Sequence, residues 1–253
     1  MLKIENLSKS FNKGTENEIT VFNGLDLNIE KNKCTAIIGS NGCGKSTLLN
    51  IIGGSINIDS GDIVLNNNNI SKLKEEKRAV NIGRVYQNPS MGVSPSLTIL
   101  ENMCLADKKG DRFSLKGLIK RNGTSKYVEL LKDLDLGLEN KLNTKVKYLS
   151  GGQRQSLSLI MAAMKYPDLL LLDEHTAALD PKTSNVVMEK TRELLKKYSI
   201  TTIMISHNMK DAIDYSDRII MLDKGKVVLD RDSKNITESE LINIYREKIQ
   251  VVA

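Results

Sequence analysis

The chain has 253 residues, of which 40% are hydrophobic, 27% are charged and 4% are aromatic, and its formal net charge is +6. This composition is typical of a globular protein with a substantial core, and no apolar run approaches the about 18 residues that a membrane-spanning helix needs. The lysine and arginine residues are scattered and aromatic residues are few, so nucleic-acid binding is not favoured.

The first third of the chain is rich in predicted strands. Alternating or β-branched apolar stretches predict strands over residues 2–7, 19–29, 35–38 and 62–65. The four asparagines at residues 66–69 lie between two apolar segments, so they predict a turn rather than a low-complexity segment.

The middle of the chain changes from strand to helix patterning. Between residues 97 and 165 the apolar residues recur at intervals of three and four, which predicts a helical insertion. Two wholly apolar runs, residues 169–172 and 203–205, then flank an amphipathic stretch at 181–198 that starts with a proline. A strand, a crossover helix and a second strand in this order predict a buried parallel sheet.

The last part of the chain is predicted to complete the same domain. Residues 218–230 are expected to form a hairpin that turns at Lys224-Gly225, and residues 238–249 a closing amphipathic helix. No internal repeat or linker-like composition interrupts the sequence, so we expect a single domain over residues 1–253.

Two features of the sequence concern the cellular compartment. Glu5 lies where a secretory signal would be apolar, so secretion is not expected. Cys34, Cys43 and Cys104 have no paired or CxxC spacing, and their odd number predicts free thiols in a reducing compartment.

A glycine-rich loop, GSNGCGKST, follows the third predicted strand and matches the phosphate-binding pattern GxxxxGK[ST]. Its backbone N–H groups and the positive end of the next helix dipole attract phosphate. We expect Lys45 to pair with the β- and γ-phosphate oxygens, Ser46 to bind Mg²⁺, and Thr47 to hold the inner phosphates. The alternative is an ordinary glycine turn before a helix. The nucleotide-binding residues predicted here are Gly39, Ser40, Asn41, Gly42, Cys43, Gly44, Lys45, Ser46 and Thr47.

The run LLLLDEH at residues 169–175 places two carboxylates at the carboxyl end of a buried strand, where ligands bind in open α/β sheets. Asp173 is expected to hold Mg²⁺ through water, and Glu174 to polarise the attacking water. The alternative is an ion-paired structural Asp-Glu pair. Together with the phosphate loop, this run favours hydrolysis of a bound nucleotide.

A second glycine-rich loop, LSGGQRQ at residues 149–155, lies between these two motifs, and Ser150 suits a helix N-cap. With the three motifs in this order, the chain resembles the ATP-binding subunits of ABC transporters over nearly its whole length.

The resemblance implies an α/β fold: a P-loop NTPase with a RecA-like core, an N-terminal antiparallel β subdomain and an inserted helical subdomain at about residues 90–165. In that family this signature loop docks on the γ-phosphate held by a second subunit's P-loop, in a head-to-tail homodimer. The signature-loop residues so implied are Ser150, Gly151, Gly152 and Gln153.

The resemblance also implies roles for four residues outside these loops. Gln87 corresponds to a glutamine that touches Mg²⁺ and the attacking water, with a surface glutamine as the alternative. His207 corresponds to a switch histidine on the γ-phosphate, with a buried hydrogen-bonding histidine as the alternative. Asp180 ends a loop that touches the partner's P-loop. Phe11 takes the place of the ring that stacks on adenine, unless it belongs to the core.

Two residues depart from the family pattern. His175 stands where the family's DEPTSALD has proline, and it is either a spacer or a group that perturbs the base Glu174. Cys43 in the phosphate loop predicts that ATP binding is sensitive to thiol reagents.

The partners are implied by the resemblance as well. They are a second copy of the chain, membrane permease subunits and, indirectly, an extracellular solute-binding lipoprotein, with no nucleic acid and a place on the cytoplasmic face of the membrane. The segment PSMGVSPSLTILENM with DEHTAALD resembles importers of amino acids, including aromatic ones. The basic stretch at residues 108–121 is expected either to contact the permease or anionic headgroups, or to be a solvated face. The alternatives are an exporter or lipoprotein-release ATPase, an ATPase that acts on DNA or ribosomes, and a non-catalytic nucleotide sensor.

Overall fold

The computed structural model describes residues 1–110 and 124–249. Most of the basic stretch at residues 108–121 therefore lies outside the described residues. The chain forms two compact units. We call Met1–Arg78 together with Thr201–Ala253 the P-loop unit, and Ala79–Ile200 the signature unit.

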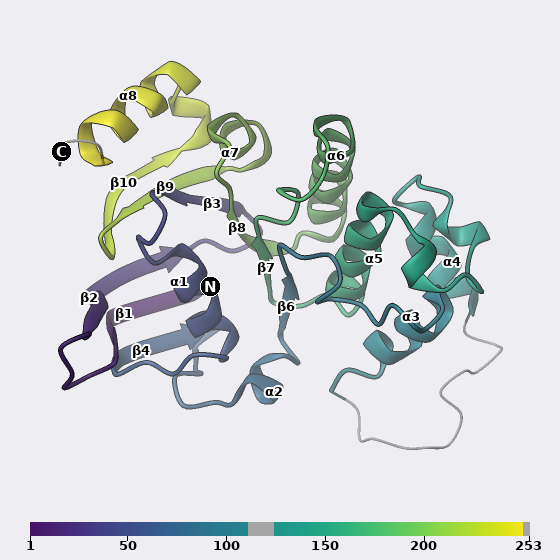
Figure 1. Ribbon diagram of the computed structural model, residues 1–253, viewed down its shortest axis with the longest axis horizontal. Coiled ribbons are helices and arrows are strands. Elements are labelled where there is room, and N and C mark those ends of the chain that lie inside the picture. Colours follow the sequence, from purple (N-terminus) through teal and green to yellow (C-terminus); the bar gives the residue numbers. More distant parts are fainter. Residues whose placement is uncertain (111–123, 250–253) are drawn as a thin grey trace. The chain divides into compact units, whose positions relative to one another are not determined.

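The N-terminal strands of the P-loop unit form an antiparallel sheet in the order β2-β1-β4-β5 (Figure 1). These strands are β1 (Leu2–Phe11), β2 (Ile19–Ile29), β4 (Ser60–Leu65) and β5 (Asn68–Asn69). Leu2 and Ile4 are buried and the residue after each is exposed, which is the alternation of a sheet with one solvated face. The asparagine turn is shorter than predicted, because only Asn66 and Asn67 have positive φ while Asn68 and Asn69 pair with β4.

The second sheet of the P-loop unit has parallel strands β8, β3 and β9, and β10 pairs with β9 in the antiparallel sense. These strands are β3 (Cys34–Gly39), β8 (Thr201–Ile205), β9 (Arg218–Asp223) and β10 (Lys226–Asp232). Every residue of β3 and β8 is buried, as in parallel strands that are covered on both faces. The helices are α1 (Lys45–Gly53), α2 (Glu75–Arg78), α7 (Met209–Tyr215), α8 (Glu238–Ile249) and the short 3₁₀ helix η4 (Ser233–Asn235).

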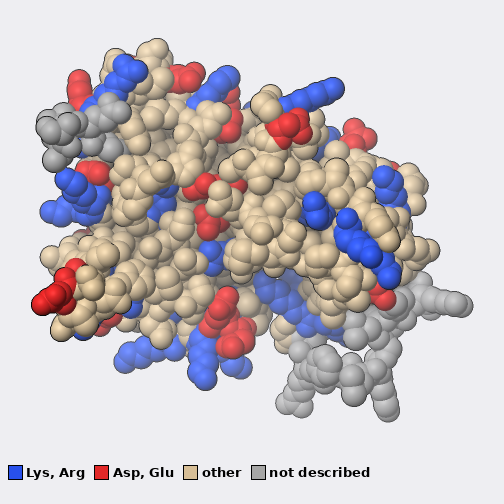
Figure 2. Space-filling model, in the orientation of Figure 1, with Lys and Arg blue, Asp and Glu red and all other residues tan. Residues whose placement is uncertain are grey.

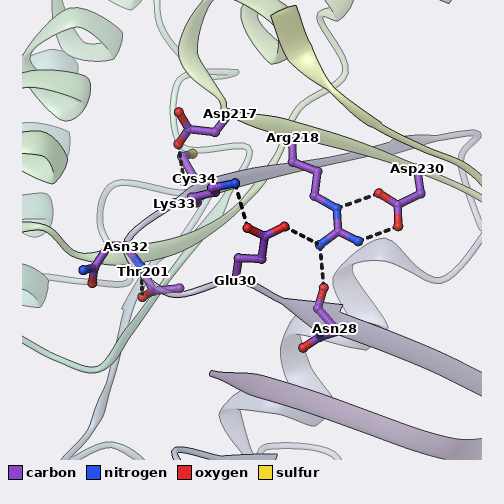
Figure 3. A network of polar contacts seen from close by, with 9 residues as sticks. All are labelled: Asn28, Glu30, Asn32, Lys33, Cys34, Thr201, Asp217, Arg218 and Asp230. Carbon is purple, nitrogen blue, oxygen red and sulfur yellow. Dashed lines mark hydrogen bonds and ion pairs between the residues drawn. The ribbon is translucent and has the colours of Figure 1, made fainter. Parts of the chain in front are cut away.

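A polar network joins the two sheets of the P-loop unit (Figure 3). Arg218, at the start of β9, donates from Nε and Nη2 to the two carboxylate oxygens of Asp230, at 2.6 and 2.5 Å. Its Nη1 donates to the backbone oxygen of Asn28 on β2, at 2.8 Å. Glu30 lies 3.8 Å from the same Nη1 and 2.7 Å from the Lys33 ammonium. Because the two-point contact with Asp230 orients the guanidinium, the bond to Asn28 fixes β2 against β9.

The signature unit has two parallel strands, and its longest helices are α5 and α6 (Figure 1). Its elements are β6 (Ile82–Val85), β7 (Leu169–Asp173), α3 (Ile99–Asp107), α4 (Thr124–Lys132), α5 (Gly151–Ala163), α6 (Pro181–Tyr198), and the 3₁₀ helices η2 (Leu138–Asn140) and η3 (Val146–Tyr148). Helix α5 packs closely on β6 at Gly83, where a Cβ would lie 2.5 Å from the carbonyl oxygen of Ala162. Glycine is therefore required at this contact.

Several predicted elements agree with the structure. The bounds expected for β2, α6 and α8 match the observed ones, and the hairpin β9–β10 turns at Lys224-Gly225. Helix α7 was not predicted, because seven residues are too few to show a clear helical period. The three cysteines are free, as expected, and all three are buried.

The exposed surface carries charges of both signs. Figure 2 shows lysine and arginine side chains interspersed with aspartate and glutamate on the face that is drawn, in keeping with their scattered positions in the sequence. Within residues 1–110 and 124–249, no helix combines the length and the apolar character needed to cross a membrane.

Candidate nucleotide-binding site

The phosphate-binding loop joins β3 to α1 and depends on glycine at three positions. Gly39, Gly42 and Gly44 have φ angles of 149°, 79° and 109°, which other residues rarely adopt. A Cβ at Gly39 would collide with the carbonyl oxygen of Leu222, and one at Gly44 would lie 2.8 Å from the ring of Phe22. Because α1 begins directly after the loop, its first N–H groups and the positive end of its dipole face the loop. This geometry suits an anion.

The side chain of Lys45 folds into the loop and is only 5% exposed. Its Nζ donates to the carbonyl oxygens of Gly39 and Ser40, at 2.8 and 2.9 Å, and lies 4.0 Å from Cys43 Sγ. The ammonium and the helix dipole therefore place positive charge at the same point. That is the electrostatic requirement for holding the outer phosphates of a nucleotide.

Cys43 is less accessible than its place in the loop suggested. The side chain is 4% exposed, and burial raises the pKa of its thiol more than the nearby Lys45 ammonium lowers it. Because the thiolate is the reactive form, a buried protonated thiol reacts slowly. The structure therefore weakens the expectation that thiol reagents readily affect ATP binding through Cys43.

The turn after β8 presents His207 at the same sheet edge as the phosphate-binding loop. Ile205 pairs with Ile37 of β3, and the N–H of Ser206 donates to the Ile37 carbonyl at 3.3 Å. His207 follows and is exposed. Asn208 then caps α7, and its N–H donates to Ser206 Oγ at 3.1 Å. Bonds on both sides of His207 thus order this turn within the P-loop unit.

In the signature unit, β6 and β7 end at a shared edge because they are parallel. Asp173 is the last residue of β7, Glu174 follows it, and Gln87 lies two residues after the end of β6. Glu174 has a φ of 45°, in the left-handed region, which turns the chain sharply after the strand. The structure thus brings these three predicted residues to one edge of this unit, while Lys45 and His207 belong to the P-loop unit.

Two polar residues at this edge, Arg84 and Gln155, were not identified from the sequence. The Arg84 Nη2 lies 3.3 Å from Asp173 Oδ2. Gln155 on α5 is fully buried, and its Nε2 donates to the carbonyl oxygen of Tyr86, directly before Gln87, at 3.1 Å. For Arg84 the available signal was a charged residue inside an otherwise apolar segment, because such a group is rarely buried without a partner. Gln155 lies in the polar run GGQRQS, which gives no such signal.

The signature loop begins α5 through a capping box. Ser150 Oγ accepts from the N–H of Gln153 and Gln153 Oε1 accepts from the N–H of Ser150, both at 3.2 Å, which confirms the expected N-cap. A Cβ at Gly152 would collide with Thr183 Cγ2 on α6, and one at Gly151 would lie 3.2 Å from Leu179 Cδ2. The two glycines therefore let the start of α5 approach the start of α6.

Asp180 has a local role as the N-cap of α6. Its Oδ1 accepts from the N–H of Thr183 at 3.0 Å, and Pro181 occupies the first helical turn. Hydrogen bonds from Thr183 lower the pKa of Asp180. The contact of Asp180 with a partner subunit stays a prediction.

Two roles were considered for His175, a spacer and a group that perturbs the base Glu174, and the structure supports the spacer. The imidazole is 2% exposed, its Nε2 lies 3.3 Å from Thr191 Oγ1 on α6, and Thr191 Oγ1 donates to the Val187 carbonyl at 2.7 Å. Burial lowers the pKa of His175 to about 4. A neutral imidazole packed against α6 does not support an electrostatic effect on Glu174.

Phe11 ends β1 and is half-buried, so it is not a core residue. The Lys9 ammonium lies 5.3 Å from the centroid of its ring, within the range of a cation–π contact. The stacking of this ring on adenine stays a prediction.

A phosphate-binding loop in a mixed α/β fold defines the class as a P-loop NTPase. Residues 22–177 match the family described as ABC transporter, and the chain belongs to this family. The "Tyrosine transport ATP-binding protein" of Clostridioides difficile (strain R20291) is 50% identical over 248 residues, which cover 97% of this chain and 98% of that protein. The "Phosphonates import ATP-binding protein PhnC" of Lactococcus lactis subsp. lactis (strain IL1403) is 33% identical over 98% of this chain and 100% of its own length.

The solved structures to which this chain is similar are ATP-binding cassettes, in agreement with the family match. The dimeric structure of a post-hydrolysis state of the ATP-binding cassette MJ0796, bound to ADP and Pi, has a TM-score of 0.78 and 31% identity, and covers 93% of this chain and 100% of that one. The ADP conformation of the cassette MJ1267 has a TM-score of 0.80 and 26% identity, over 97% and 98% of the two chains. The chain therefore has the fold of an ABC ATPase, and it is an ATP-binding, ATP-hydrolysing subunit of an ABC transporter.

Proposed function

We propose that this chain powers the uptake of an amino acid, with tyrosine as the first candidate, through separate permease subunits. The observation that carries the proposal is the 50% identity with the tyrosine transport protein, which extends over 97% of this chain. Other relatives are also named for import, including the spermidine/putrescine protein PotA of Haemophilus influenzae, at 31% identity. The solute itself is recognised outside this subunit, by the permease and a solute-binding lipoprotein.

ATP binds at the phosphate-binding loop of the P-loop unit in this proposal. Lys45 and the loop amides hold the β- and γ-phosphates, and Thr47 at the start of α1 holds the inner phosphates. Phe11 packs against the adenine ring, which selects an aromatic base without reading its edges. The buried ammonium of Lys45 and the glycine conformations described above support this placement.

The available oxygen atoms fit Mg²⁺. The Ser46 hydroxyl and the Gln87 amide offer hard oxygen ligands, and the Asp173 carboxylate would hold Mg²⁺ through water. Mg²⁺ in ATPases usually keeps several waters and needs only one or two protein ligands beside the phosphates. When bound, Mg²⁺ neutralises charge on the transferred phosphoryl group.

Hydrolysis requires a base, a residue that positions the water and a contact to the γ-phosphate. Glu174 accepts the proton of the attacking water, Gln87 orients that water and His207 donates toward the γ-phosphate. The products are ADP and phosphate. Glu174 and Gln87 follow the carboxyl ends of the paired parallel strands β7 and β6. His207 follows the carboxyl end of β8, which pairs with β3, the strand that leads into the phosphate-binding loop. These placements support the proposed roles.

Two copies of the chain complete each site in this proposal. The signature loop of one copy, with Ser150, Gly151, Gly152 and Gln153, contacts the γ-phosphate on the other copy's P-loop, beside Asp180. ATP binding then closes the dimer and hydrolysis reopens it, and this motion is passed to permease subunits at the inner face of the membrane. The capped helix start at Ser150 and the dimeric cassette bound to ADP and Pi support the arrangement.

The catalytic part is tested with Glu174→Gln. We expect ATP binding to be retained, turnover to fall at least about 100-fold, and a dimer to accumulate with ATP, as measured by light scattering. Glu189→Gln, on the exposed face of α6, is the matched control and should leave all three unchanged. Lys45→Ala should instead weaken ATP binding itself. Substantial turnover in Glu174→Gln, or unchanged ATP affinity in Lys45→Ala, would contradict the assigned roles.

The cargo is tested with the permease and lipoprotein that co-purify with this subunit, reconstituted together with it in proteoliposomes. Tyrosine should stimulate ATP hydrolysis. It should also cross the bilayer and accumulate on the side opposite to the one that binds the lipoprotein. Stimulation by a phosphonate or by spermidine instead of tyrosine would replace the proposed solute, and outward movement of the solute would refute import.

A further inference from the structure

Arg84 is an unusual residue for its position. It lies on β6, whose other residues are all buried, and its own side chain is only 13% exposed. A charged side chain is rarely placed on a buried strand unless a partner compensates its desolvation. The partner is Asp173, whose side chain is 14% exposed.

Two contacts hold the guanidinium in place. Its Nη2 lies 3.3 Å from Asp173 Oδ2 at the end of the neighbouring strand β7. Its central carbon lies 4.6 Å from the centroid of the ring of Tyr86, the residue that directly follows β6. A guanidinium that lies over a ring and bonds a carboxylate has little freedom left, so it transmits a defined orientation to that carboxylate.

Stability alone does not explain the pair. A mostly buried ion pair contributes little compared with apolar residues of the same volume, because the desolvation of both charges offsets their attraction. An apolar residue at position 84 would fit a strand of this kind at least as well. The pair is better explained by what it does to Asp173, and carboxylates that act on metals are commonly held by a further hydrogen bond.

We infer that Arg84 is a positioning residue, which fixes the Asp173 carboxylate through Oδ2 in the orientation that Mg²⁺ binding requires. The inference rests on the proposed role of Asp173. A carboxylate offers about four acceptor positions, so one bond from Arg84 does not by itself saturate it. Arg84 touches neither the nucleotide nor the reacting water in this account, and it acts only through Asp173.

The test measures how the binding of trinitrophenyl-ATP to the full-length protein depends on MgCl₂, starting from EDTA. For Arg84→Met we expect unchanged affinity for trinitrophenyl-ATP in EDTA. The Mg²⁺ concentration that gives half of the Mg²⁺ effect on binding should rise about tenfold, which is the scale seen when a supporting hydrogen bond to a metal ligand is lost. Arg84→Lys should recover part of this shift, because it keeps the charge but not the planar geometry. Arg192→Met, which removes an arginine from the exposed part of α6, is the control.

The outcomes separate this inference from the function on which it rests. An unchanged Mg²⁺ dependence in Arg84→Met overturns the positioning role, and so does a lower half-effect concentration, which would mean that Arg84 competes with the metal. Loss of nucleotide binding in EDTA also overturns it, since the residue would then be purely structural. If Asp173→Asn leaves the Mg²⁺ dependence unchanged, the metal role of Asp173 itself is wrong.

Discussion

Arg78 anchors the far end of the helix that follows the phosphate-binding loop. It ends α2, is 2% exposed, and donates from Nη1 to the carbonyl oxygens of Ile51 and Ile52 near the end of α1, at 2.7 and 3.1 Å. It also donates from Nη2 to Ser71 and from Nε to Leu73, at 2.9 Å each. All four acceptors are backbone carbonyls. A cation at the carboxyl end of a helix is also favoured by the helix dipole.

The size of the effect of Arg78→Met follows from these contacts. Each hydrogen bond contributes about 1 kcal/mol, so the loss of four costs about 4 kcal/mol in the free energy of unfolding. Part of this is offset, because the guanidinium is desolvated in the native state, and burial lowers the pKa of Arg78 for the same reason. We therefore expect a loss of about 3 kcal/mol, from a total that is usually about 5–15 kcal/mol.

Urea unfolding followed by far-UV circular dichroism is the suitable assay, since the chain contains no tryptophan. The midpoint of Arg78→Met should fall by about 1–3 M, given a slope of about 1–3 kcal/mol per M. Lys77→Met, an exposed neighbour on α2, is the control and should change stability by less than about 0.5 kcal/mol. If the two variants unfolded at the same midpoint, the anchoring role of Arg78 would be refuted.

Two further predictions concern the signature unit. The pKa of His175 falls from 6.5 to about 4 on folding, so the unfolded state takes up a proton first as the pH drops below 6.5, and stability is lost down to about pH 4. Urea unfolding at pH 7 and pH 5 should show that the wild type loses about 2 kcal/mol more than His175→Gln, and equal losses would contradict the buried neutral imidazole. Gly152→Ala should cost about 1–3 kcal/mol, because its Cβ meets Thr183 Cγ2, and adding Thr183→Ser should restore much of the loss in melting temperature. No recovery in the double variant would show that the clash is not the cause.

Much of the fold and of the candidate site was predictable from local patterns. The order of Gly39, Gly44 and Lys45 predicted a phosphate-binding loop, since only glycine tolerates the φ angles found there. The capping of α5 by Ser150 was equally visible, because a capping box involves residues three positions apart. The β-strands and α6 followed from the period of their apolar residues.

The contacts that distinguish this chain were not predictable in the same way. Arg84 and Asp173 are 89 residues apart in sequence, and Gln155 and Tyr86 are 69 apart. Their pairing depends on the parallel register of β6 and β7 and on the packing of α5 over β6. The same holds for the bond from Arg218 to Asn28. Local periodicity specifies which residues turn inward, but the partner of a buried polar group depends on which strands become neighbours, and that is settled only when the chain packs.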